Sequence, residues 1–145
     1  MSFPPQPREV VGLSWPPGKL PRPAVVLQFE AGQVFVIYGT STHRPGMHCI
    51  RVDASSREGR NLRIQNTTFF YESGIMACLP ENLLSWTGRC PPDLFLALRE
   101  FAEPRILAML EDVARRQAAL LVAPSGAESE EVRDRPEKAA LTPDP

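Results

Sequence analysis

The 145 residues, of which 43% are hydrophobic and 23% charged, suit one globular domain and leave no room for a second domain of ordinary size. The net charge of -1 divides unevenly: residues 1–92 hold 9 Lys+Arg and 6 Asp+Glu (+3), whereas residues 93–145 hold 7 and 11 (-4), so only the first part favours an anionic partner. No apolar run approaches the roughly 18 residues of a membrane-spanning helix, and MSFPPQPREV does not resemble a signal peptide, so we expect a cytoplasmic protein that does not enter the membrane.

The first predicted strands lie in the N-terminal third of the chain. Glu9 to Leu13 is predicted to be a short strand. The prolines of residues 14–21 fix φ and remove hydrogen-bond donors, which predicts a loop. Ala24 to Phe29 and Val34 to Tyr38 are predicted to pair as an antiparallel hairpin, because Glu30-Ala31-Gly32-Gln33 between them suits a tight turn.

The middle of the chain adds further short strands. His48 to Asp53, Asn61 to Gln65 and Ile75 to Leu79 are predicted to be strands, and the segment Ala54 to Arg60 is rich in turn residues. Thr67 to Tyr71 is either another strand or a packed loop. Five or six short strands within about 75 residues predict a mainly β (α+β) fold built on a small barrel, since closure removes exposed strand edges.

The C-terminal part has helical periodicity. Proline and Asp93 suit the first turn of a helix that starts after Cys90, and apolar side chains recur through Phe101 at helical spacing. Pro104 is expected to break or kink this helix. A second amphipathic helix is expected over residues 103–122, where its apolar stripe would pack in the core or in a dimer.

Both ends of the chain are expected to lack a fixed structure. Residues 1–7 are rich in proline and are expected to be flexible. Residues 123–145 hold six acidic and three basic residues with few large apolar side chains, which predicts a disordered acidic tail. The folded part is therefore expected within residues 8–122.

No cofactor or metal chemistry is expected from the motifs. The sequence has no Walker loop, dinucleotide-binding glycine motif, GxSxG or HExxH. Cys49, Cys78 and Cys90 are widely spaced and form no CxxC, which favours reduced structural thiols. His43 and His48, with Cys49, form the only cluster of possible metal ligands, and without a clear further ligand we interpret them as ordinary histidines.

Arg22 is the first candidate functional residue. Pro21 and Pro23 restrict the backbone on both sides of it, at the entrance of a predicted buried strand. The partner strand ends in Gly39-Thr40-Ser41-Thr42, and antiparallel pairing makes Arg22 and Thr40 neighbours. A guanidinium beside hydroxyl groups suits an oxyanion or a phosphate. The simpler alternative is a surface cation that ends a loop.

The order of these segments resembles the PemK/MazF toxins of bacterial toxin–antitoxin systems. The similar features are a proline-bearing loop, the strand RPAVVLQ, an apolar strand ending in GTST, further short strands and a C-terminal helix. The resemblance runs from about Arg8 to Phe101 and includes FYESGIMACLP (Phe70 to Pro80) and TGRCPPDL (Thr87 to Leu94). The chain departs from the family at Arg8-Glu9, where Gly-Asp or Gly-Glu is usual, and in its compact first loop.

This resemblance implies an SH3-like barrel and a metal-independent endoribonuclease that cuts single-stranded RNA. The ribose 2′-hydroxyl would attack the neighbouring phosphorus, leaving a cyclic phosphate and a free 5′-hydroxyl. The catalytic pair of the family matches Arg22 and Thr40, with Ser41 as the alternative to Thr40. The resemblance also implies a homodimer, inhibition by a cognate antitoxin protein and no cofactor.

Four further residues are expected to contact RNA: Trp15, Lys19, His43 and Arg44. Trp15 is a candidate for stacking on a base, and His43 is a candidate general base because histidine changes protonation near neutral pH. Two other functions stay open. One is a non-catalytic SH3-like module that binds protein or nucleic acid, and the other is a toxin of the same architecture that poisons gyrase.

Overall fold

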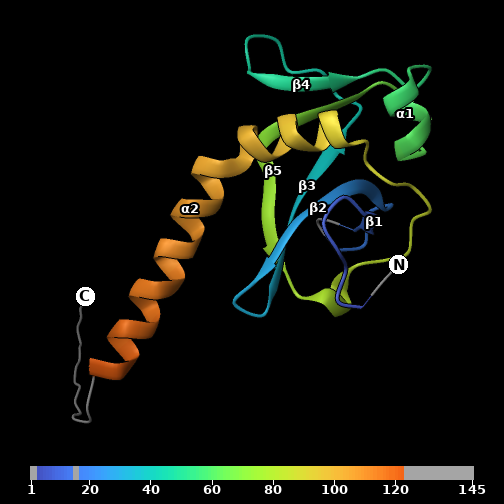
Figure 1. Ribbon diagram of the computed structural model, residues 1–145. Helices are drawn as coiled ribbons and strands as arrows, with labels where there is room; N and C mark the ends of the chain where they lie inside the picture. The colour runs from blue at the N-terminus through green and yellow to red at the C-terminus, as the bar shows by residue number, and fades with distance from the viewer. Residues whose placement is uncertain (1–2, 15–16, 123–145) are drawn as a thin grey trace, which may run out of the picture. The chain divides into compact units, whose positions relative to one another are not determined.

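The computed structural model describes residues 3–14 and 17–122 of the chain (Figure 1). The chain forms two compact units, Met1–Ile106 and Leu107–Pro145. The described residues form a five-stranded antiparallel sheet and a long C-terminal helix, which confirms the predicted α+β class. None of the helices in this described part is long and apolar enough to cross a bilayer.

The predicted hairpin is confirmed and lies at the centre of the first unit. Its strands are β2 (Arg22–Glu30) and β3 (Gln33–Thr40), which pair with Glu30 opposite Gln33. Ala31 and Gly32 form the turn with φ of 55° and 76°. Two consecutive positive φ values are those of a type I′ turn, whose twist matches that of the strands.

The sheet order is β1-β2-β3-β5-β4, with β1 at Val10–Leu13, β4 at Cys49–Val52 and β5 at Thr68–Cys78. The predicted strand at 75–79 and the segment 67–71, predicted as a strand or a packed loop, thus fall largely within the single strand β5. Within the described residues no ladder joins β1 to β4, so the expected closure into a barrel does not occur. Single bridges, Gly12 to Leu84 and Glu9 to Arg89, instead place the segment before the last helix along the outer edge of β1.

Residues 54–56 form a turn as predicted, but α1 spans Arg57–Leu62, so the predictions of a turn as far as residue 60 and of a strand at 61–65 are wrong. Ser56 caps this helix: its hydroxyl accepts a hydrogen bond from the Gly59 N–H at 3.0 Å. A Cβ at Gly59 would overlap the Asp53 carbonyl oxygen, so glycine is needed at this position. Because glycine has a low helix propensity, it also makes the helix harder to predict from the sequence. The alternation of Leu62 and Ile64 with polar residues is typical of a strand, although Leu62 is the last residue of α1.

Helix α2 runs without interruption from Pro92 to Val122 and contains Pro104, so of the expected break or kink at this proline the break is wrong. In the first unit it buries one side chain per turn: Leu94, Leu98, Ala102 and Ile106. This regular burial continues on both sides of Pro104 and explains why the helix tolerates the proline, which lacks one hydrogen-bond donor. In the second unit the helix exposes 77% of Leu120 and 87% of Leu121.

One cluster of buried side chains lies on one face of the sheet between β1, β2 and β3. Its members are small or medium aliphatic residues, namely Val11, Leu13, Ala24, Val26, Val34, Val36 and Leu83. Alternate residues of each strand supply them, as expected for a sheet face that packs into a core. This core fixes the ends of β2 and β3, where the candidate site lies.

Candidate functional site

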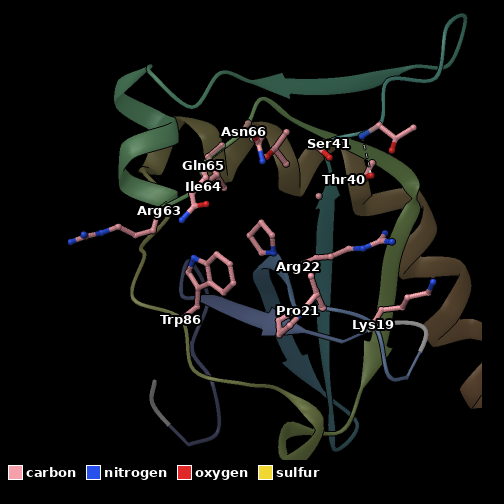
Figure 2. Close-up of a pocket in the computed structure, with 15 residues that line it drawn as sticks. Lys19, Pro21, Arg22, Thr40, Ser41, Arg63, Ile64, Gln65, Asn66 and Trp86 are labelled. Atoms are coloured by element: carbon pink, nitrogen blue, oxygen red, sulfur yellow. Dashed lines mark hydrogen bonds between the residues drawn. The ribbon is translucent and has the colours of Figure 1, made fainter.

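A pocket of about 660 Å³ opens at the end of the central hairpin where β2 begins and β3 ends (Figure 2). Residues 19–23, 39–42 and 63–66 line it, together with Thr68 and Trp86. Its walls therefore come from the loop before β2, the end of β3, the segment after α1 and the segment before α2. Its volume is that of an ordinary small-ligand site.

Arg22 and Thr40 both line this pocket, as the sequence predicted. They are the first residue of β2 and the last residue of β3, and the pairing of Ala24 with Tyr38 puts them on opposite strands at the same level. The Arg22 guanidinium carbon lies 5.4 Å from the centre of the Tyr38 ring, a cation–π contact that orients the side chain.

The hydroxyl of Thr40 is held by the turn that follows it. Thr40 Oγ1 accepts a hydrogen bond from the Thr42 N–H at 3.2 Å, drawn as a dashed line in Figure 2. An accepting hydroxyl keeps its own hydrogen for a ligand. Ser41, between these two residues, also lines the pocket and is exposed. The strand end thus offers two hydroxyl donors beside Arg22.

The charge at the pocket is positive. Lys19, Arg22 and Arg63 line it, and no Asp or Glu is among its described lining residues. In the described part of the chain none of these three cations forms a salt bridge. Figure 2 shows Arg63 at the rim with its side chain extending outward. Cations without an internal counter-charge attract an anionic ligand.

Gly39 and Thr68 shape the floor of the pocket. A Cβ at Gly39 would overlap the Thr68 Cγ2 methyl group, so only glycine fits there without a shift. The register between β3 and β5 shifts between Ile37 and Gly39, and such a bulge changes the direction of the following side chains. Thr68 is buried, and its hydroxyl donates to the Asn66 carbonyl oxygen at 3.0 Å. The bulge and the glycine therefore set the position of Thr40.

Trp86 forms an aromatic wall that the sequence reasoning missed. Its indole Nε1–H donates to the Leu62 carbonyl oxygen at 3.0 Å, at the end of α1. Close by, the Arg89 N–H donates to the Asn61 carbonyl oxygen at 2.9 Å. The segment before α2 thus satisfies two carbonyl groups that the helix end leaves free. These bonds place the indole beside the pocket.

Of the four predicted RNA-contacting residues, the three that the structure describes do not line one common pocket. Lys19 lines the pocket, and Trp15 lies outside the described residues. Arg44 lies in a smaller recess that shares Thr40 with the pocket; its Nη1 donates to Ser73 Oγ at 3.0 Å and its guanidinium carbon lies 5.0 Å from the Tyr71 ring centre. His43 lines neither space, and its ring centre lies 5.1 Å from that of Phe69.

Arg63, Gln65, Asn66 and Trp86 complete the pocket and were not predicted as site residues. The first three were assigned to a predicted strand and the turn after it. That assignment gave no reason to place their side chains at one site. Trp86 had one signal in the sequence: it is a large aromatic residue in the polar segment SWTG, directly before the helix entry. Only the packing of that segment against α1 shows that it faces the pocket.

The remaining titratable candidates lie apart from the pocket. All three cysteines are free, as predicted, and burial raises the pKa of Cys78 to about 11 and that of Cys90 to about 12. These two thiols are protonated at neutral pH and are poor nucleophiles. His48 packs its ring against Phe101, and no cluster of three His, Cys, Asp or Glu side chains that could hold a metal occurs in residues 3–14 and 17–122.

The fold and the pocket define an α+β domain with a cationic, hydroxyl-bearing cavity at the end of its central hairpin. No protein-family model matches the chain, and a search of curated proteins finds none similar to it. The chemistry of the pocket residues therefore carries the functional inference. Guanidinium, ammonium and hydroxyl donors around one cavity are the groups that bind phosphate.

Proposed function

We propose that this protein is a toxin-like endoribonuclease of the PemK/MazF kind, which cleaves single-stranded RNA without a metal ion. The observation that carries the proposal is the placement of Arg22, Thr40 and Ser41 in one pocket with two further cations and, among its described lining residues, no carboxylate. This arrangement suits a phosphodiester, which is anionic and accepts hydrogen bonds at its oxygens.

In this proposal the sheet is an SH3-like barrel that is left open between β1 and β4. The bridges from Gly12 to Leu84 and from Glu9 to Arg89 account for the opening, because they cover the edge of β1 that closure would use. Arg8 supports the resemblance to the family: its φ of 78° is a value that glycine adopts most easily, and the family usually has glycine at this point.

Arg22 is assigned the stabilisation of the transition state. During attack by the 2′-hydroxyl, negative charge grows on the phosphorane oxygens, and an arginine that is already charged and oriented lowers the barrier. Thr40 is assigned a hydrogen bond to a phosphate oxygen or to the attacking hydroxyl, with Ser41 as the alternative. Loss of one such contact commonly reduces the rate about 100-fold to 1,000-fold.

The decisive experiment incubates the purified protein with a long single-stranded RNA in EDTA and maps the ends of the fragments. Cleavage that leaves 5′-hydroxyl ends and disappears in Arg22→Ala supports the proposal. Arg51→Ala is the matched control, since Arg51 lies in β4, pairs with Asp53 at 3.0 Å and is not a lining residue. Equal cleavage by Arg22→Ala and wild type would assign the activity to another site or to a contaminant.

We further propose a homodimer that is cytoplasmic and is inhibited by an acidic antitoxin segment laid over the cationic pocket. The absence of carboxylates among the described lining residues supports the binding of an acidic segment, because such a peptide would supply the missing counter-charge. Light scattering tests the dimer. A competition assay between a labelled RNA and an acidic peptide, repeated with Arg22→Ala, tests whether the two ligands share the pocket.

A non-catalytic RNA-binding module is the second candidate. The observation that favours it is the lack of both carboxylate and imidazole among the described lining residues, which leaves no side chain there suited to remove the 2′-hydroxyl proton. Binding of RNA that weakens in Arg22→Ala, without cleavage at any ionic strength, would select this candidate over the enzyme.

A further inference from the structure

We infer that the wall of the pocket formed by Trp86, Gln65 and Asn66 holds one nucleobase, next to the phosphate bound at Arg22. This inference rests on the proposed function and adds to it the residue that stacks on RNA. The pocket volume of about 660 Å³ is larger than one phosphate requires, and the aromatic wall and the cations line the same space. A nucleotide carries both groups that such a pocket suits, a flat ring and an anionic phosphate.

Trp86 has the fixed position that stacking requires. The bond from its Nε1 to the Leu62 carbonyl oxygen, at 3.0 Å, ties one edge of the indole to the end of α1. Its Cε3 edge is close to β1, where a Cβ added at Gly12 would lie 3.5 Å from it. Both edges of the indole thus lie against other parts of the protein. The side chain is only half-buried, and it lines the pocket.

Two amide side chains that line the same pocket as Trp86 are available to read a base. Gln65 and Asn66 are exposed, they line the pocket, and their side-chain amides form no hydrogen bond with other described residues. Figure 2 shows both at the edge of the pocket, with Asn66 between Gln65 and Ser41. An amide carries a donor and an acceptor, which complement the edge of an unpaired base in single-stranded RNA.

The test measures binding without cleavage. A fluorescent RNA pentanucleotide carrying 2′-O-methyl groups lacks the attacking hydroxyl, so its anisotropy reports affinity alone. An abasic series, with one base removed at a time, locates any base that the protein holds. We expect one abasic position to weaken wild-type binding about tenfold, the effect of losing one aromatic stacking contact.

The variants assign that position to this wall. We expect Trp86→Leu to bind the intact RNA about tenfold more weakly and to lose little more at the sensitive abasic position, whereas Trp86→Phe retains most of the affinity. Asn66→Ala, at an exposed side chain, should change which base is preferred there. If Trp86→Leu fails to fold, the abasic series in wild type and Asn66→Ala decides the question.

The outcomes separate this inference from the proposed function. Binding that depends on Arg22, with no sensitive abasic position or with the same sensitivity in Trp86→Leu, overturns the nucleobase site alone. An abasic effect that vanishes in Trp86→Leu supports the site even if long RNA is never cleaved. Failure of wild type to bind any of the pentanucleotides overturns the proposed function and the nucleobase site together.

Discussion

Arg63 has a backbone conformation that glycine adopts more easily than arginine. It ends α1 with φ of 61° and ψ of 39°, in the left-handed region. Most side chains cost roughly 1 kcal/mol there. This conformational cost falls at a position where the side chain adds a cation to the rim of the pocket. A residue that lowers stability where it lines a cavity is a reasonable sign of function.

We therefore predict that Arg63→Gly stabilises the protein and weakens RNA binding. The free energy of unfolding should rise by up to about 1 kcal/mol, measured by urea denaturation. The slope of log affinity against log salt should fall by about one, because one cation is lost. Arg60→Gly is the control. Arg60 lies inside α1, so glycine there should lower the stability of the protein by about 1 kcal/mol. Lower stability of Arg63→Gly would contradict the strain.

Gly39 allows a second residue-level prediction. In Gly39→Ala the new methyl group would overlap the Thr68 Cγ2 methyl, so the end of β3 or β5 must shift. We expect a loss of about 1–3 kcal/mol of stability and a displaced Thr40. Thr68→Ser removes the obstructing methyl and keeps the hydroxyl bonded to the Asn66 carbonyl, so it should restore much of the loss. Equal destabilisation of the single and double variants, in urea denaturation, would refute the overlap.

At the scale of elements, the β2–β3 turn supplies a prediction about stability alone. Ala31 has φ of 55° at the first central position of a type I′ turn, where asparagine is favoured. Ala31→Asn should raise the melting temperature and add about 0.5 kcal/mol of stability. Gly32→Ala, at φ of 76°, should do the reverse. RNA binding should not change in either variant, because the turn lies at the opposite end of the hairpin from Arg22.

Elements whose signals are local in the chain are predicted from the sequence, and elements that depend on tertiary contacts are not. The hairpin was predicted because its apolar runs and its turn are adjacent in the chain. Helix α1 was missed because Gly59 and the alternation of Leu62 with Ile64 both argue against a helix, while its stability comes from the Ser56 cap and from tertiary contacts. Pro104 misled in the same way: burial along α2 outweighed its local preference.

Across the whole molecule, the predictability of a pocket residue depends on how far along the chain it lies from its neighbours in the pocket. Arg22 and Thr40 were predictable because one hairpin brings them together. Arg63 and Trp86 were not, because they enter the pocket through the packing of α1 against the segment before α2. The expected barrel failed for a related reason: closure was inferred from the need to protect edges, and the bridges to residues 84–89 protect β1 without it.

The division of the chain into two units gives the last prediction. Met1–Ile106 contains the sheet, the pocket and the buried helix positions up to Ile106, so a fragment that ends at Leu110 should fold by itself. It keeps one helical turn beyond Ile106 as protection against fraying. We expect a cooperative thermal transition and RNA affinity within about threefold of the full chain, less than the effect of one lost stacking contact.

A shorter fragment that ends at Phe95 is the control for this truncation. It lacks Leu98, Ala102 and Ile106, each at most 1% exposed, and loses the apolar burial that these three side chains contribute. For a domain of marginal stability such a loss is enough to prevent cooperative folding. If the fragment ending at Leu110 behaves like this control, with no cooperative transition by circular dichroism, the helix beyond the first unit is required for folding and the first unit is not an independent domain.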